Sequence, residues 1–153
     1  MGKKDRKPLI DKNVASLKSV TTYINKNVAT LIGNNENGDD SKVIISFIHI
    51  QNNYQCFSDW SKQEMNEFWG FYKKLHQYTW QQVYLTSGKT QKNGIAYTVI
   101  PTSKYPNKDF KENLSEDITI FELRVTQKGR VHGFRNKAVF YICWLDRNHE
   151  ITS

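Results

Sequence analysis

The clearest pattern lies in the last third of the chain, where short apolar stretches alternate with charged turns. Three stretches are rich in β-branched and aromatic residues: ITIFELRV at 118–125, RVHGFR at 130–135 and AVFYICWL at 138–145. Runs of this length and composition predict strands. The QKG segment and the pair Asn136-Lys137 are short enough to join them as two hairpins, with Gly129 suited to a left-handed conformation. The sequence therefore predicts a three-stranded antiparallel meander.

The middle of the chain shows a helical period instead. In SKQEMNEFWGFYKKLHQ (61–77), Ser61 and Glu64 form a capping-box pattern. Thr79 begins TWQQVYLT (79–86) and suits the N-cap of a second, short helix. Apolar side chains in the first segment recur every three or four residues, which predicts a helix with one buried face: Met65, Phe68, Trp69, Tyr72 and Leu75.

The remaining segments suggest the limits of the folded unit. VIISFIHI at 43–50 predicts a strand, IAYTVI predicts a shorter one, and 101–117, with two prolines, predicts a loop or a broken helix. A helical stripe runs through 13–32, although its β-branched and asparagine content leaves a pair of strands open. We therefore expect a basic, partly helical N-terminal extension over 1–42. An α+β domain over 43–153 follows, with an antiparallel-rich sheet packed on helices.

The charge balance narrows the class of partner. The chain has 22 Lys and Arg against 15 Asp and Glu, a formal charge of +7. Such an excess favours nucleic acid, an acidic protein or an anionic membrane surface as partner, although many small proteins are basic without a specific reason. No run approaches the roughly 18 apolar residues of a membrane span. The first twelve residues lack the apolar core of a secretory signal, so we expect a cytoplasmic protein that does not use a membrane.

The two cysteines, Cys56 and Cys143, show no metal-ligand spacing and no CxxC pair. Two thiols in a chain of this size suit a reducing compartment, with a disulfide left open. We expect neither a metal nor another cofactor.

Strand alternation predicts which side chains share a face of the meander. With loops at 127–129 and 136–137, Arg124 lies opposite His132, and His132 lies opposite Tyr141. Arg130 shares their face, so a cationic row Arg124–His132–Tyr141 is predicted on an open side of the sheet. The opposite face is predicted to be the core: Phe121, Leu123, Val125, Val131, Gly133, Phe140, Ile142 and Trp144.

That row has the residue types of metal-independent RNA cleavage, so we predict a catalytic set of His132, Arg124, Arg130 and Tyr141. Histidine exchanges a proton near neutral pH, arginine binds phosphate and stabilises charge, and tyrosine stacks on bases. A histidine beside an arginine in a strand is more often structural, and Arg124 has Glu122 as a possible ion-pair partner. The cations around the row are predicted to contact nucleic acid: Lys128, Lys137, Arg135, Arg147 and His149.

The segments FELRVTQKGRVHGF and YICWLDRNHEI, with Arg124 and Arg130, resemble the RelE/ParE superfamily of small bacterial toxins. The order of strand, two helices and meander is similar as well. The resemblance implies a RelE-like α+β fold, activity on ribosome-bound mRNA or on gyrase, and an acidic antitoxin as partner. Residues 87–117 are longer than the equivalent link, and 1–42 have no counterpart.

Two classes of function remain open from the sequence. The first is a basic RNA-binding protein that acts as a metal-independent mRNA endoribonuclease. The second is a non-catalytic module that binds nucleic acid or protein in a toxin–antitoxin or phage-related system. Salt-sensitive binding without turnover would indicate the second.

Overall fold

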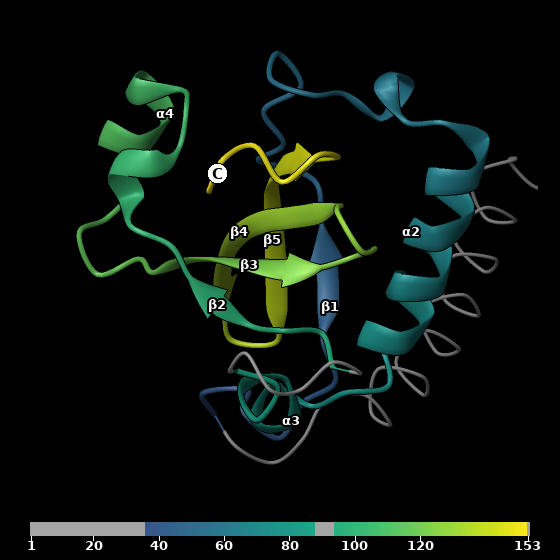
Figure 1. The fold of residues 1–153 in the computed structure, drawn as a ribbon. Coiled ribbons are helices and arrows are strands. Elements are labelled where there is room, and N and C mark those ends of the chain that lie inside the picture. Colours follow the sequence, from purple (N-terminus) through teal and green to yellow (C-terminus); the bar gives the residue numbers. More distant parts are fainter. Residues whose placement is uncertain (1–35, 88–93, 153) are drawn as a thin grey trace, which may run out of the picture.

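The computed structural model describes residues 36–87 and 94–152, which form an α+β fold around one five-stranded mixed sheet (Figure 1). The strand order is β1-β5-β4-β3-β2, with β1 at one edge and β2 at the other. Each strand is bounded as follows: β1 Ile44–Ser46, β2 Thr98–Val99, β3 Ile120–Arg124, β4 Arg130–Asn136 and β5 Val139–Asp146.

The predicted meander is confirmed as β3, β4 and β5, which pair in antiparallel fashion. Its loops differ from the prediction. Arg124 pairs with Arg130 rather than with His132, and Asn136 pairs with Val139, which leaves Lys137-Ala138 as the turn. Each hairpin is therefore displaced by two positions from the predicted pairing. A shift of two keeps side chains on their predicted face, as far as the register irregularity between His132 and Gly133.

The turn residues also differ from expectation. Lys137 has the left-handed backbone, with a φ of 53°, whereas Gly129 is not among the described residues with positive φ. The Thr126 hydroxyl accepts hydrogen bonds from the amides of Lys128 and Gly129 and closes the first hairpin loop without a left-handed glycine.

The sheet is mixed because β1 lies parallel to β5. The strand predicted over 43–50 shortens to three residues because the chain turns at Phe47–Ile50, where the Ile50 amide donates to the Phe47 carbonyl. IAYTVI contributes only β2, which pairs with β3. The helix predicted over 13–32 lies outside the described residues.

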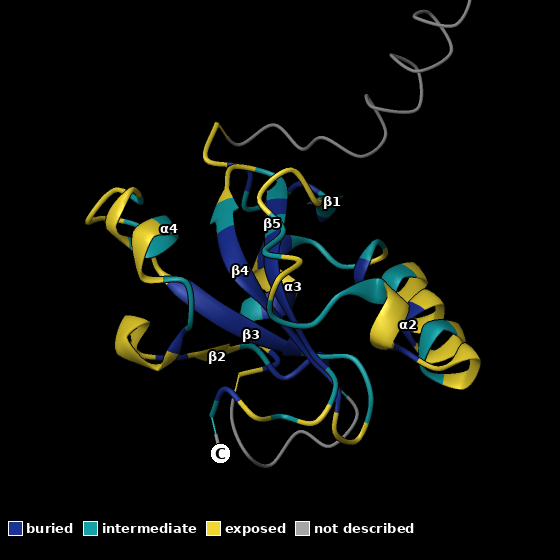
Figure 2. Ribbon diagram, turned by 90° about the horizontal axis from the view of Figure 1, so that it is seen from above, coloured by how far each residue is buried: buried dark blue, intermediate teal, exposed yellow. Residues whose placement is uncertain are grey.

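Both predicted capping patterns are confirmed. Ser61 caps α2 (Lys62–Leu75) in a capping box with Glu64, and Thr79 caps the short α3 (Trp80–Tyr84). The proline-containing segment 101–117 holds a 3-10 turn at Thr102–Lys104 and the short α4 (Lys108–Glu112). Figures 1 and 2 agree in placing α2 and α4 on opposite sides of the sheet.

The sheet has an apolar cluster on each face, which corrects the expectation of an open face. The larger cluster packs α2 and α3 against Phe121, Leu123, Val131, Phe140 and Ile142. The second cluster covers part of the other face with side chains from 100–118 and the C-terminal tail, and in Figure 2 β3, β4 and β5 are buried along most of their length. Its buried members are Ile100, Tyr105, Ile120, Phe134, Cys143, Trp144 and Ile151.

A β-bulge between His132 and Gly133 explains why Trp144 belongs to this second cluster. Gly133 pairs with Ile142, but His132 pairs with Trp144, so β5 carries one extra residue. Side chains beyond the bulge change face. Trp144, predicted in the main core, therefore lies on the His132 side together with Asp146.

None of the helices in 36–87 and 94–152 combines the length and apolarity needed to cross a membrane.

Candidate functional site

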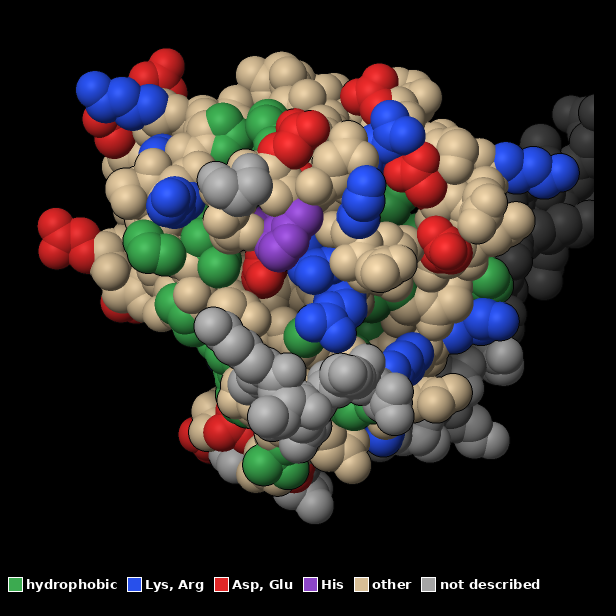
Figure 3. Space-filling model, in the orientation of Figure 1, with side chains coloured by type: hydrophobic (Ala, Val, Ile, Leu, Met, Phe, Trp, Pro, Cys, Tyr) green, Lys and Arg blue, Asp and Glu red, His purple; other side chains and the backbone are tan. Residues whose placement is uncertain are grey.

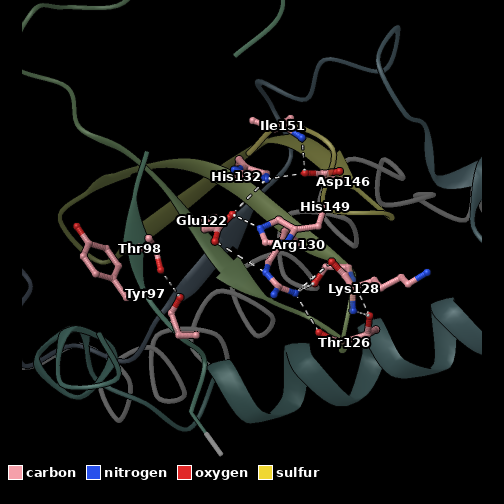
Figure 4. A network of polar contacts seen from close by, with 12 residues as sticks. Tyr97, Thr98, Glu122, Thr126, Lys128, Arg130, His132, Asp146, His149 and Ile151 are labelled. Carbon is pink, nitrogen blue, oxygen red and sulfur yellow. Dashed lines mark hydrogen bonds and ion pairs between the residues drawn. The ribbon is translucent and has the colours of Figure 1, made fainter. Parts of the chain in front are cut away.

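A compact group of ionisable side chains lies on the His132 side of the sheet (Figure 4). We call it the Glu–His cluster. It brings together residues of β3, β4, the end of β5 and the loop after it: Glu122, Arg130, His132, Asp146 and His149. The group combines two carboxylates, two imidazoles and one guanidinium, which are the residue types used for proton transfer and anion binding.

His132 is the buried support of this cluster. It is fully buried, its Nε2 lies 3.2 Å from Asp146 Oδ2, and its Nδ1 lies 3.0 Å from the Tyr105 hydroxyl. Burial raises the pKa of Tyr105 far above its usual range, so the phenol keeps its proton. Burial also acts to raise the pKa of Asp146, but hydrogen bonds from His132 and two backbone amides outweigh it and lower that pKa. Both ring nitrogens of His132 thus have partners inside the protein, and the ring is not accessible to solvent.

Glu122 and Arg130 form the next layer. Glu122 pairs with His132 across β3 and β4, and its Oε1 lies 3.9 Å from Arg130 Nε. Arg130 NH1 donates to the carbonyls of the hairpin loop at residues 126–129. Burial lowers the pKa of Arg130 and Glu122 acts in the opposite sense, but a guanidinium stays charged at neutral pH. Arg130 is thus held between the loop and the carboxylate.

His149 completes the cluster from the loop that follows β5. Asp146 accepts hydrogen bonds from the amides of Glu150 and Ile151, and Ile151 is buried in the second apolar cluster. These contacts fold the tail back over the sheet and leave His149 between them in a left-handed conformation, with a φ of 59°. Such a backbone is uncommon outside glycine, and unusual conformations of this kind cluster at functional sites.

The His149 ring faces Glu122 on one side and solvent on the other. Its Nε2 is buried and lies 3.4 Å from Glu122 Oε2, an ion-pair distance without a hydrogen bond between the two atoms, while 38% of the side chain is exposed. Figure 3 shows a histidine near the middle of this face, with acidic atoms and Lys or Arg side chains beside it. His149 combines a partly exposed imidazole with a buried carboxylate close to its Nε2.

The structure separates the predicted row Arg124–His132–Tyr141. Tyr141 is paired with Phe134 across β4 and β5 and stacks on it at 5.1 Å between ring centroids. It packs against the second apolar cluster, two positions along the sheet from the predicted pairing. Arg124 is adjacent to Arg130 instead of His132.

Two residues predicted to contact nucleic acid have internal partners. Arg135 pairs with Asp39 at 2.7 Å and stacks over Trp80 at 4.8 Å. Arg147 makes two hydrogen bonds to Glu64 near the start of α2. Lys128 and Lys137 lie in the hairpin turns and are exposed, where contact with a polyanion is sterically open.

The Glu64–Arg147 pair gives a pH-dependent contribution to stability. The Arg147 hydrogen bonds hold the pKa of Glu64 at about 2, against 4.5 in an unfolded chain. Because the folded value is the lower one, the stabilisation is complete above pH 4.5 and declines as the pH falls toward 2. We expect Glu64→Gln to lower the Tm by about 3 °C at pH 7, because the pair remains in contact with solvent.

The measurement is thermal unfolding from pH 7 to pH 3 by circular dichroism, with the exposed Glu112→Gln as the matched control. The difference in Tm between wild type and Glu64→Gln is expected to become smaller below pH 4.5. A difference that stays constant over this range would contradict the assignment.

Sequence reasoning missed Glu122, Asp146 and Tyr105 as members of this network. A period-two strand signal places Glu122 beside Arg124, but only the true register sets it opposite His132. Asp146 reaches His132 because the bulge changes its face.

Within 36–87 and 94–152, no group of three or more His, Cys, Asp and Glu side chains is arranged to hold a metal ion. No protein-family model matches the chain, and no curated protein or solved structure shows significant similarity to it.

Proposed function

We propose that this chain binds single-stranded RNA over the face that carries His149 and cleaves it by attack of a 2′-hydroxyl on the adjacent phosphate. The observation that carries the proposal is the partly exposed His149 ring with its buried Nε2 3.4 Å from the buried carboxylate of Glu122. A base oriented by a carboxylate is a recurring arrangement for removing a hydroxyl proton. RNA brings its own nucleophile, so the protein has to supply only a base and positive charge.

In the proposed reaction, His149 takes the proton of the 2′-hydroxyl at Nδ1, because its Nε2 is buried beside Glu122, and Glu122 stabilises the imidazolium that forms. The 2′-oxygen bonds to phosphorus while the bond to the 5′-oxygen breaks, and the leaving oxygen takes a proton from water. The products are a 2′,3′-cyclic phosphate and a 5′-hydroxyl. Arg130, fixed by the loop carbonyls and Glu122, contributes positive charge beside the phosphate.

The formal charge of +7 supports a polyanionic ligand, and Lys128 is an exposed cation in the loop whose carbonyls hold Arg130. The resemblance to RelE/ParE toxins is compatible with this reading. It adds three proposals: a RelE-like topology, ribosome-bound mRNA as the cytoplasmic substrate, and an acidic antitoxin that covers the same face.

A non-catalytic RNA-binding module is the second candidate. The contacts of Arg130 favour this second candidate, because backbone carbonyls and Glu122 already occupy much of the Arg130 guanidinium. In such a module the Glu–His cluster would stabilise the fold, and the surface cations would provide affinity without turnover.

The deciding experiment incubates the purified chain with a fluorescently labelled RNA oligonucleotide in EDTA, with and without ribosomes. Cleavage should leave a 2′,3′-cyclic phosphate, and the same oligonucleotide with 2′-deoxy nucleotides throughout should stay intact. Cleavage of the deoxy strand would rule out the proposed chemistry. Salt-sensitive binding with no cleavage in either condition would establish the non-catalytic module instead.

A further inference from the structure

A pocket of about 540 Å³ lies between α2 and the start of the β3–β4 hairpin. Its walls combine side chains of the helix with those at the end of β3 and the segment before β2. Two of them are cationic and one is acidic: Arg124, Lys74 and Glu67. Arg124 also ties this pocket to the proposed site, since it is the strand neighbour of Arg130.

Unlike Arg130, Arg135 and Arg147, Arg124 forms no ion pair with a carboxylate of the described residues. Its backbone is fixed, because its amide donates to the Ile95 carbonyl at 2.7 Å. Its Nε is buried and has no hydrogen-bond partner in the structure. A buried donor without an acceptor is unfavourable. A bound anion could supply the acceptor that the described residues do not offer to this Nε.

Arg130, the strand partner of Arg124, differs because the protein supplies acceptors for its guanidinium. It faces Glu122 and four loop carbonyls. The two guanidinium groups repel each other, which contributes to the lowered pKa of Arg130. Glu122 pairs with Arg130, so the charge of Arg124, which lines the pocket, is not balanced by that carboxylate.

We propose that this pocket binds a second phosphate of the RNA strand, next to the one that is cleaved, with Arg124 as its principal ligand and Lys74 as a further cation. The inference rests on the proposed function and specifies its substrate. Arginine binds phosphate oxygens through paired N–H donors, and such an oxygen would satisfy the buried Nε. The substrate is then an RNA with at least two consecutive phosphates. A dinucleotide without a terminal phosphate has only one phosphate and should bind less well.

The test compares kcat/KM for a dinucleotide and for the same dinucleotide extended by one nucleotide on its 5′ or its 3′ side. Wild type should prefer the extended substrate, on one side only. Arg124→Gln should reduce that preference about tenfold, the value of one charged hydrogen-bonded contact. Arg124→Lys should restore part of it. Lys108→Gln, the same charge change on the exposed α4, should leave the preference unchanged.

If Arg124→Gln lowered kcat/KM by the same factor for both substrates, Arg124 would act at the cleaved phosphate, and the second site would be overturned. An unchanged preference would overturn it as well. A binding measurement separates this inference from the proposed reaction: affinity for a 2′-O-methyl RNA, which cannot be cleaved, is followed by anisotropy against salt concentration. Arg124→Gln should reduce the slope of log affinity against log salt by about 0.7, even if no RNA is ever cleaved.

Discussion

His149→Asn is expected to lower the rate of RNA cleavage about 1000-fold while leaving the fold intact. General-base catalysis by one side chain typically contributes about 100- to 10,000-fold, and asparagine cannot take up the hydroxyl proton. Asparagine is the suitable replacement because His149 has a φ of 59°, a conformation that asparagine adopts more readily than alanine. The loop can therefore keep its shape, and the change isolates the chemistry of the ring.

The measurement is single-turnover cleavage of the labelled RNA, together with urea unfolding of each variant. Glu122→Gln keeps the shape of the carboxylate but removes the charge that would stabilise the imidazolium. It should reduce the rate about 10- to 100-fold, less than the loss of the base itself. If His149→Asn cleaves RNA as fast as wild type, His149 is not the base.

His132→Ala is the informative contrast, because the two histidines differ in burial. His132 is fully buried and holds Asp146 and Tyr105, so its removal leaves a cavity and a buried carboxylate that has lost a donor. A loss of about 3 kcal/mol of unfolding free energy is expected, against less than about 1 kcal/mol for His149→Asn. Low activity of His132→Ala would therefore reflect the fold, whereas His149→Asn tests the reaction.

The elements of this fold were predictable because their signals are local. The Ser61 and Thr79 caps, the helical stripe of α2 and the three apolar stretches of the meander each depend on residues close in sequence. Even the wrong hairpin loops kept Glu122, Arg124, Arg130 and His132 on one face, because both errors were displacements by two.

The site was less predictable because its contacts depend on a single irregularity. Uninterrupted alternation places Trp144 with the main core and leaves the other face open. The bulge beside Gly133 moves Trp144 and Asp146 to the His132 side, where Trp144 stacks on Tyr105 at 4.7 Å. Gly133 is a local signal for a bulge, but it does not specify which strand gains the extra residue, so the burial of His132 emerged only from the three-dimensional arrangement.

Gly133→Ala is expected to give the largest loss of stability among these variants. A Cβ atom at Gly133 would lie 1.8 Å from the carbonyl oxygen of Tyr141, and 3.0 Å from the ring of Phe140. The obstacle is the backbone of the interior strand β5, which cannot move without breaking its pairing with β4 on one side or β1 on the other. We expect a loss of more than about 3 kcal/mol of unfolding free energy, or mostly insoluble protein.

Gly70→Ala provides the control for this prediction, measured by the same urea unfolding. Gly70 lies within α2, and a Cβ atom there would meet nothing within 4 Å. Alanine is favoured over glycine in a helix interior, so this variant should gain about 0.5–1 kcal/mol. A loss of unfolding free energy at Gly133 and a gain at Gly70, for the same chemical change, would locate the cause at the close approach of β4 and β5.

If Gly133→Ala instead folds with wild-type stability, the two strands are farther apart than described. The bulge that brings Asp146 to His132 would then have to be reconsidered, and with it the support for the loop that carries His149.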